Sequence, residues 1–303
     1  MGQPLSRLDP LGATGATIAS ATLRLQSNRA NQTPADTSRS ELGCTLLCVP
    51  KVSVTIITKD EEADIGAALA SVGWADEIIV VDSRSRDQTV DLAKAANARV
   101  IVREWPGYIA QKNFAADQAS HDWILSLDAD ERVTPDLARD VQRALQNPTH
   151  AAYDFPRLTW HLGQWIRGTD WYPDYQTRLY DRRAATWTGQ LVHEGLTVRG
   201  STGRLNGDLH HFAYRDISDH LDTINRYTTL AARQMYDKGR RTSVWQLLVH
   251  GPLAFLRNYV ARGGFRLGSA GVIISVMNGY YVFLKFAKLW QLQASPQARP
   301  NED

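Results

Sequence analysis

The chain has 303 residues and a formal net charge of +2, and 43% of its residues are hydrophobic. This length can bury a substantial apolar core. The mild charge argues against a nucleic-acid-binding protein, because no Lys/Arg stripe with interleaved aromatic residues dominates any segment. The two cysteines, Cys44 and Cys48, form neither a metal quartet nor a disulfide framework, which is typical of a reducing compartment.

Residues 1–48 are rich in Ser, Thr, Ala, Asn and Gln and show no sustained hydrophobic period. They lack the basic start and the compact apolar run of a secretory signal. We expect a flexible extension outside the fold.

From residue 52 onward, short apolar runs alternate with segments of helical spacing. Apolar, β-branched runs predict strands at 52–58, 77–82, 99–102 and 123–127. Helical spacing predicts helices at 65–72, 89–96 and 109–119, and after Thr134-Pro135. Four such alternations favour an α/β fold with a mainly parallel sheet and helices on both faces.

The second half of the chain changes character twice. Between residues 151 and 211 the helical period fades and tryptophans accumulate, so we expect an irregular cover that faces the substrate. Helical spacing returns over 217–290. Within it, the eighteen uncharged residues 267–284 reach the lower length limit of a membrane span. Gly, Ser and Asn dilute this run, so we expect an interfacial segment, with a helix packed on the protein or a true span as alternatives.

Two carboxylates, Asp128 and Asp130, directly follow the fourth predicted strand. In an extended segment alternate side chains project from the same side, so both carboxylates are expected to converge on one hard cation, or on one ribose and one cation. Ligands of parallel sheets bind outside the carboxyl ends of the strands, where Thr58 and Asp82 also lie. The loop at 58–62 contains no glycine, so phosphate binding is expected to depend on a metal and on cations.

Over about residues 52–290 the chain resembles family 2 glycosyltransferases, which have the GT-A fold. The resemblance depends on four ordered motifs: residues 56–62, residues 80–89, Gln111-Lys112-Asn113-Phe114, and Asp128-Ala129-Asp130-Glu131. Residues 105–107, 160–178 and 192–194 are most similar to bacterial enzymes that add a glucose-type sugar to the lipopolysaccharide inner core.

This resemblance implies a role for the residues of the first two motifs. Thr58 and Glu61 would shape the nucleotide pocket, and Asp82 would hydrogen-bond the base, usually uracil. The structural alternative for Asp82 is a turn cap.

The third and fourth motifs would hold the diphosphate. Lys112 would be a cation beside it, unless it is a solvated surface lysine. Asp128 would contact the ribose or the metal, and Asp130 would hold Mg²⁺ or Mn²⁺ against the phosphates.

An inverting transfer also needs a general base that takes the proton of the acceptor hydroxyl. The family commonly places this base in an acidic pair downstream of the metal motif, and here His193-Glu194 stands in place of Glu-Asp. Glu194 is the expected base and Asp174 the alternative, although Glu194 could also be a surface salt-bridge partner.

Three kinds of basic side chain are further candidates. His193 could bind the metal, orient the base, or be a structural histidine. His210 and His211 are weaker candidates for reaching the phosphates. Arg178 is a candidate for a phosphate or acceptor contact, because a guanidinium presents fork geometry to oxyanions.

Together these features predict a metal-dependent inverting glycosyltransferase. It would move a hexose, most simply glucose from UDP-glucose, to a lipid-linked saccharide such as the lipopolysaccharide core, as a peripheral enzyme on the cytoplasmic face of the bacterial inner membrane. The alternatives are a sugar-nucleotide pyrophosphorylase, which usually needs a Gly-rich loop, and an inactive membrane-associated binding module. The expected parts are a catalytic domain at 49–215, with a nucleotide-sugar half at 52–147 and an acceptor half at 148–215, a helical region at 216–293 and a tail at 294–303.

Overall fold

The computed structural model describes residues 49–190 and 193–294, apart from the side chains of Gln190, His193 and Glu194. The extension expected at 1–48 and the tail expected after 294 lie outside these residues.

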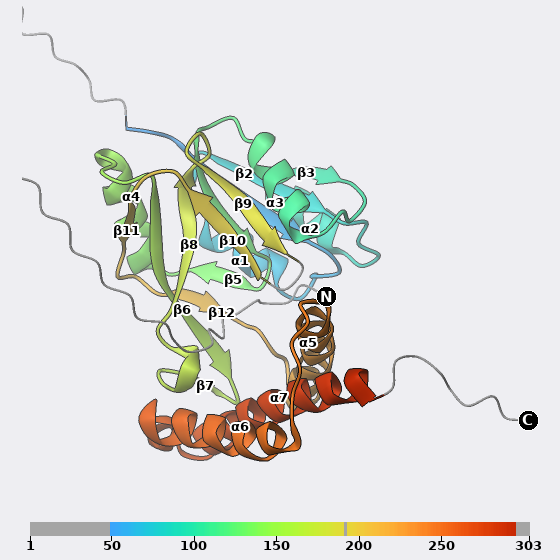
Figure 1. The fold of residues 1–303 in the computed structure, drawn as a ribbon. Helices are drawn as coiled ribbons and strands as arrows, with labels where there is room; N and C mark the ends of the chain where they lie inside the picture. The colour runs from blue at the N-terminus through green and yellow to red at the C-terminus, as the bar shows by residue number, and fades with distance from the viewer. Residues whose placement is uncertain (1–48, 191–192, 295–303) are drawn as a thin grey trace, which may run out of the picture. The chain divides into compact units, whose positions relative to one another are not determined.

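The first four strands form the parallel part of one sheet, in the order β3-β2-β1-β4 (Figure 1). These strands are β1 (Val52–Thr58), β2 (Glu77–Asp82), β3 (Arg99–Val102) and β4 (Trp123–Asp128). All seven residues of β1 are buried, because β1 has a neighbour on each side and a hydrophobic layer on each face. The predicted run of β-branched residues is the signature of such a strand.

Helices pack on both faces of this sheet, as the alternating pattern predicted. The helices are α1 (Ile65–Ser71), α2 (Thr89–Ala95), α3 (Tyr108–Asp117) and α4 (Pro135–Gln146). Side chains of α1, α2 and α4 share one hydrophobic cluster with β1 and β4, whereas α3 belongs to the cluster on the opposite face. The side chain of Thr134 caps α4 by accepting from the Leu137 N–H, and proline occupies the first turn, as expected.

The prediction of an irregular cover at 151–211 is wrong, because most of this segment extends the sheet itself. The order continues from β4 through β8 (Asp174–Asp181), β6 (Ala152–His161) and β12 (Leu209–His211) to β5 (Glu131–Val133). The β4–β8, β8–β6 and β12–β5 pairs are antiparallel, so the sheet is mixed beyond β4.

Short elements complete this half of the fold. The hairpin of β9 (Ala185–Gln190) and β10 (His193–Val198) packs with α3 on one face of the sheet. Both β7 (Gln164–Trp165) and β11 (Thr202–Arg204) pair with β6, and a 3-10 turn, η1, spans Thr169–Trp171.

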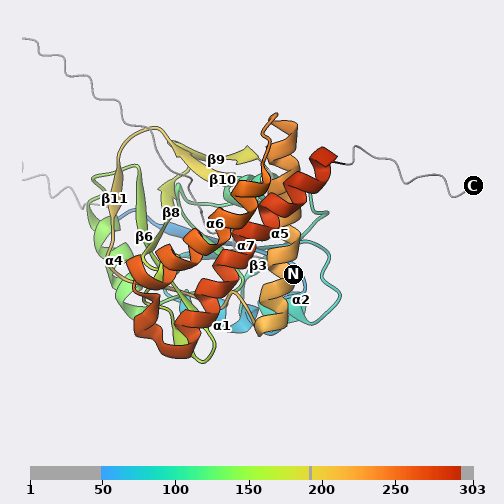
Figure 2. The ribbon, with the colours of Figure 1, turned by 60° about the horizontal axis from the view of Figure 1, so that its bottom comes forward.

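The C-terminal region is helical, as predicted. It contains α5 (Ile217–Asp237), α6 (Val244–Leu256) and α7 (Gly268–Ala294), and α7 packs on both α5 and α6 (Figure 2). The α6–α7 crossing is close because glycines face each other there: a Cβ on Gly279 would lie 3.0 Å from the carbonyl oxygen of Gly251. A π turn, η2 (Arg257–Ala261), and a 3-10 turn, η3 (Gly264–Leu267), join α6 to α7.

One carboxylate ties this helical region to the sheet. Asp170, in η1, binds the guanidinium of Arg257 and lies 3.3 Å from Arg262 Nε. Its backbone N–H donates to Asn258 Oδ1 at 2.8 Å. The segment that leads into β8 is therefore anchored on the turn between α6 and α7.

Among the described residues, one helix, Gly264–Ala294, is long and apolar enough to cross a membrane by length and composition. Its most apolar 18-residue window has a mean hydropathy of 1.5, and 33% of that window is buried. The buried residues of α7 include Ala270, Ile274 and Gly279, so one face of the helix packs on protein.

Candidate functional site

The predicted site residues of three strands meet at one edge of the sheet. Thr58 and Asp82 end β1 and β2 and are paired across them, and Asp128 ends β4 beside Ile57. This is the edge at which open α/β sheets bind ligands.

Asp82 is fully buried and already has partners within its own turn. Its carboxylate accepts from the backbone N–H of Ser85 at 2.9 Å and from the Ser85 hydroxyl. The geometry is that of the turn cap, and the contact with a base stays a prediction. The Thr58 hydroxyl is buried without a hydrogen-bond partner among the described residues. Glu61 contributes its backbone N–H, which donates to Thr89 Oγ1 at 2.8 Å.

The prediction that Asp128 and Asp130 project from one side of an extended strand is wrong. β4 ends at Asp128, and Ala129-Asp130 form a turn into β5. The strand alternation therefore does not apply, and the two carboxylates have different partners. Asp128 lies 3.0 Å from Lys112 Nζ and 2.7 Å from Arg178 Nη2. Burial alone would raise the pKa of Asp128, but the charges of Arg178 and Lys112 hold it well below its usual range.

Lys112 is not a surface lysine. Its side chain is 2% exposed and its ammonium lies 4.6 Å from the ring centroid of Trp187. α3 therefore places a cation at the end of β4, beneath the β9–β10 hairpin.

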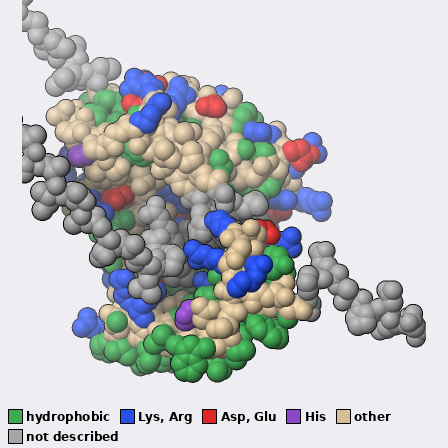
Figure 3. All heavy atoms as spheres, in the orientation of Figure 1, with side chains coloured by type: hydrophobic (Ala, Val, Ile, Leu, Met, Phe, Trp, Pro, Cys, Tyr) green, Lys and Arg blue, Asp and Glu red, His purple; other side chains and the backbone are tan. Residues whose placement is uncertain are grey.

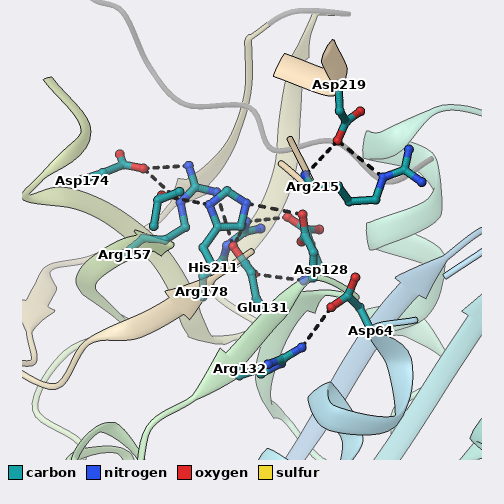
Figure 4. Close-up of polar contacts among 12 residues, drawn as sticks. Asp64, Asp128, Glu131, Arg132, Arg157, Asp174, Arg178, His211, Arg215 and Asp219 are labelled. Carbon is teal, nitrogen blue, oxygen red and sulfur yellow. Dashed lines mark hydrogen bonds and ion pairs between the residues drawn. The ribbon is translucent and has the colours of Figure 1, made fainter. Parts of the chain in front are cut away.

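The Asp128 contacts belong to a buried charge network that crosses β4, β5, β6 and β8 (Figure 4). Arg178 also donates to Glu131 Oε1 at 3.0 Å, and Arg157 lies 3.3 Å from the same oxygen. Arg157 reaches Asp174 Oδ2 at 2.7 Å. The network contains three cations and three carboxylates: Lys112, Arg157, Arg178, Asp128, Glu131 and Asp174. Its charge is balanced, which is what allows so many ionic groups to be buried together.

Asp130 has the properties of a metal ligand. It is buried, its Oδ1 has no hydrogen-bond partner among the described residues, and its Oδ2 lies 3.4 Å from His211 Nε2. Burial raises the pKa of Asp130, and His211 opposes that rise. A buried carboxylate oxygen without a donor is costly unless a cation or a water satisfies it.

The side chains around Asp130 fit a Mg²⁺ or Mn²⁺ ion that is held partly by the protein and partly by the phosphates of a bound substrate. His211 Nδ1 lies 3.2 Å from Thr159 Oγ1, a contact that can orient Nε2 toward Asp130. No group of three or more His, Cys, Asp or Glu side chains in the described part of the chain forms a complete cage. Mg²⁺ is commonly bound by one or two protein ligands together with substrate phosphates, so two side chains suffice.

Comparison with known proteins assigns the family. The model of glycosyl transferase family 2 matches residues 53–199. A lipopolysaccharide core biosynthesis glycosyltransferase, LpsC of Rhizobium meliloti, is 33% identical over 84% of this chain and 98% of its own length. An uncharacterised glycosyltransferase of Rickettsia prowazekii is 31% identical over 82% of this chain and 89% of its own.

The chain belongs to glycosyltransferase family 2. The resemblance to this family, the α/β fold with its C-terminal helices and the assignment as a transferase are thereby confirmed. Among solved structures, glucosyl-3-phosphoglycerate synthase from Mycobacterium tuberculosis, in complex with Mn²⁺ and UDP, has 18% identity and a TM-score of 0.43, and the match covers 64% of this chain and 82% of that one. TarS of S. aureus has 12% identity and a TM-score of 0.42, with 82% and 92% covered.

The two candidate bases of this family 2 glycosyltransferase are in different situations. Asp174 Oδ2 accepts two hydrogen bonds from Arg157, and its Oδ1 accepts from Gln176 at 2.8 Å, so both oxygens are engaged. Glu194 lies in β10, paired with Gly189. The side chains of Glu194 and His193 lie outside the described residues, and their predicted roles stay predictions.

Sequence reasoning missed or underrated three residues of this glycosyltransferase site. His211 ranked as a weak candidate, and Arg157 and Glu131 received no role. β12 pairs with β5 so that His211 is the register partner of Glu131, and this long-range pairing brings His211 to the motif that contains Glu131. The sequence signal that could have pointed to Arg157 and His211 is a basic side chain within a mostly apolar segment. This signal is weak, because buried structural residues show it too.

Proposed function

We propose that this protein is a metal-dependent, inverting glycosyltransferase that moves a hexose, most simply glucose from UDP-glucose, to a lipid-linked saccharide. Its similarity to a lipopolysaccharide core biosynthesis glycosyltransferase favours the lipopolysaccharide core as the acceptor. The observation that carries the proposal is the buried Oδ1 of Asp130, which has no hydrogen-bond partner in the described part of the chain and lies beside His211, at the strand ends where a nucleotide diphosphate would lie.

Two buried cations are placed to receive the diphosphate. Lys112 and Arg178 both bind Asp128, so the site without a donor is internally neutralised. A bound diphosphate would bring its own negative charge next to these cations. We infer that Lys112 and Arg178 then share their hydrogen bonds between Asp128 and phosphate oxygens, which stabilises the charge that develops on the leaving nucleotide.

Asp130 and His211 are the side chains that would hold Mg²⁺ or Mn²⁺. When bound, the metal acts as a Lewis acid that neutralises charge on the departing diphosphate. Asp130 contributes the anionic oxygen, and His211 contributes Nε2 while Thr159 orients its ring.

The acceptor hydroxyl must lose a proton while it attacks the anomeric carbon from the face opposite the diphosphate. We assign the role of the general base, which accepts this proton, to Glu194. Asp174 is the second choice, because Arg157 and Gln176 already occupy its oxygens. A carboxylate fully engaged by donors is poorly placed to accept a further proton in the transition state.

The test of the metal assignment is Asp130→Asn, with Asp91→Asn as the matched control on the exposed surface of α2. We expect Asp130→Asn to lose both Mn²⁺-enhanced binding of UDP, measured by calorimetry, and transfer from labelled UDP-glucose to core acceptor. Asp91→Asn should retain both. Undiminished transfer in Asp130→Asn would refute the metal role. Release of pyrophosphate from a nucleoside triphosphate would instead support a pyrophosphorylase, and donor binding without transfer would support an inactive module.

The base is tested with Glu194→Gln and Asp174→Asn. Glu194→Gln should bind UDP with wild-type affinity but lose turnover. If turnover is unchanged in Glu194→Gln and lost in Asp174→Asn, the role belongs to Asp174.

We also propose that α6 and α7 rest on the cytoplasmic face of the inner membrane. Hydrophobic side chains gather along the lower edge of the space-filling view, where α6 and α7 lie (Figure 3). On α6, Trp245 and Leu248 are 72% and 63% exposed, and on α7, Val272 and Val276 are exposed one turn apart. Large exposed apolar patches mark membrane or protein contacts.

The charge around this apolar surface fits anionic lipid. Arg257, Arg262 and Arg266 are exposed in the connection between α6 and α7. Basic side chains near a membrane surface are attracted to anionic headgroups. One face of α7 packs on α5 and α6 while the other is exposed, which favours a helix lying at the interface.

Membrane attachment is tested by flotation with liposomes that contain anionic lipid. We expect the double variant Trp245→Glu/Leu248→Glu to stay unbound, whereas Val102→Glu, which changes an exposed residue of β3, should float like the wild type. Flotation of the double variant at the wild-type level would refute the interfacial role of α6.

A further inference from the structure

A cavity of about 490 Å³ lies between the end of β6 and the start of α5. Its size falls within the roughly 300–1,000 Å³ of small-molecule sites. Its wall includes Trp160, His161 and the turn Leu162–Gly163 on one side, and the segment Tyr214–Ser218 on the other. A second hollow of about 310 Å³ continues along α5 and shares Arg215, Asp216 and Ser218 with the first.

One wall of this cavity is aromatic. The ring of Tyr214 stacks on His220, with centroids 4.2 Å apart and planes at 20°. Trp171 lies 5.7 Å from Tyr214 and 5.6 Å from His161. These rings support one another, so the side chains that line the cavity are held in place.

His161, which lines the cavity, also carries a buried polar atom. His161 is 2% exposed, and its Nε2 has no hydrogen-bond partner among the described residues. Burial lowers the pKa of His161, so the ring is neutral at pH 7 and can donate or accept one hydrogen bond through Nε2. A buried nitrogen without a partner is expected to bind a water or a ligand group.

The opposite wall is polar. In the continuing hollow, three aspartates, Asp216, Asp219 and Asp222, outnumber two arginines, Arg215 and Arg226. Arg215 already pairs with Asp219 at 3.7 Å (Figure 4). The excess of carboxylates disfavours a phosphate or another anion. Hydroxyl groups, in contrast, can donate to carboxylates and accept from the arginines.

The cavity lies between the proposed metal carboxylate and the membrane-facing helices. Tyr214, which lines the cavity, follows His211 by three residues, and His211 Nε2 lies 3.4 Å from Asp130 Oδ2. On the other side, Leu162 packs in one hydrophobic cluster with Ile274 of α7. An acceptor that is anchored in lipid beside α7 and reacts beside Asp130 would pass this cavity.

We propose that this cavity binds a neutral sugar unit of the acceptor saccharide. The apolar face of the sugar lies on Tyr214 and Trp160, its hydroxyls bond to Asp216, and the following sugar reaches the reaction centre. This inference rests on the proposed function, since it names the substrate part that the site receives. The aromatic wall of the cavity and the excess of carboxylates in the adjoining hollow together favour an uncharged, hydroxyl-rich ring.

Ser218 offers a way to fill the cavity without removing a contact. It is exposed and lines both hollows. Ser218→Trp would occupy the space, and Ser218→Ala would leave it open. The matched control is Ser201→Trp, because Ser201 is an exposed serine whose carbonyl accepts from Ala151 at the start of β6. The cavity is at the other end of this ten-residue strand, about 30 Å away.

Two readouts separate the cavity from the donor site. Hydrolysis of UDP-glucose without an acceptor reports on the donor site. The KM for deacylated core oligosaccharide reports on the acceptor site, and binding of this oligosaccharide is also measured directly by saturation-transfer NMR. We expect Ser218→Trp to raise the acceptor KM at least about tenfold and to weaken the NMR signal, with donor hydrolysis within about twofold of wild type. Ser218→Ala and Ser201→Trp should match the wild type in both.

The possible failures are distinguishable. An acceptor KM in Ser218→Trp equal to that of Ser201→Trp would overturn the sugar subsite and leave the transferase intact. Preferential binding of a phosphorylated over a neutral saccharide, lost in Ser218→Trp, would overturn the neutral-sugar assignment. A wild-type protein that binds the oligosaccharide but neither hydrolyses nor transfers from any UDP-sugar would contradict the proposed function, while loss of that binding in Ser218→Trp would still support the cavity.

Discussion

Replacing Glu131 with glutamine would remove one negative charge from the centre of the buried network. The Glu131 side chain is fully buried, and its Oε1 lies 3.0 Å from Arg178 and 3.3 Å from Arg157. The variant would leave three cations facing two carboxylates. Removing one partner of a buried ion pair costs about 3–5 kcal/mol, because the other charge stays buried without compensation. Glutamine keeps an oxygen that accepts hydrogen bonds, so we expect the lower end, a loss of about 3 kcal/mol in the free energy of unfolding.

The assay is urea denaturation at pH 7, with tryptophan fluorescence as the probe of unfolding. The control is Asp136→Asn, which also removes one acidic charge but from an exposed i,i+3 pair with Arg139. The control should change the free energy of unfolding by less than about 0.5 kcal/mol. Equal unfolding midpoints for Glu131→Gln and Asp136→Asn would refute the reasoning, since they would mean that the two arginines do not depend on Glu131 for charge compensation.

Three further predictions concern other parts of the fold. Burial lowers the pKa of His220 from 6.5 to about 4. Between these two pH values the unfolded chain binds a proton at this histidine that the folded chain does not bind. Lowering the pH from 7.5 to 5 should therefore reduce the free energy of unfolding by about 2 kcal/mol through this group. His220→Phe should remove that part of the pH dependence in urea titrations at both pH values, and an unchanged dependence would contradict the assignment. Asp170→Asn removes the carboxylate that binds Arg257 and Arg262; we expect faster tryptic cleavage after Arg257, and a cleavage rate equal to that of the wild type would show that the anchor is dispensable. Gly279→Leu adds a side chain whose Cβ would lie 3.0 Å from the carbonyl oxygen of Gly251, and it should lower the unfolding free energy by about 1–3 kcal/mol in thermal denaturation. Val276→Leu, on the exposed face of α7, is the control. Equal melting temperatures for the two variants would argue against a close crossing.

The parallel part of the sheet was predictable because its strands are locally encoded. In β1 and β2, apolar β-branched residues occur in short runs between polar segments, and β1 is buried along its whole length. β6 gave no such signal, although eight of its ten residues are buried. It contains Arg157 and Thr159 among its buried residues, so neither a hydrophobic run nor a strict alternation is visible. Its neighbours, β8 and β12, join it through pairings that no local pattern contains.

The site shows the same division between local and long-range information. Lys112, Asp128 and Asp130 were predicted from motifs that are each only a few residues long. The partners that determine what these residues do come from elsewhere: Arg178 from β8 and His211 from β12. Burial of Lys112 was also invisible in the sequence, because it depends on Trp187 of the β9–β10 hairpin.

The turn at Ala129-Asp130 gives the two carboxylates of the motif different tasks. Asp128 faces two cations that neutralise it, so a metal ion would compete with Lys112 and Arg178 for its oxygens. Asp130 faces only a histidine and keeps one buried oxygen without a donor among the described residues. Two carboxylates on one side of a strand would have made a single, strongly anionic site. The turn instead leaves one carboxylate paired with two buried cations and one that is suited to a metal, so in the proposed function both kinds of positive charge would act on the leaving diphosphate.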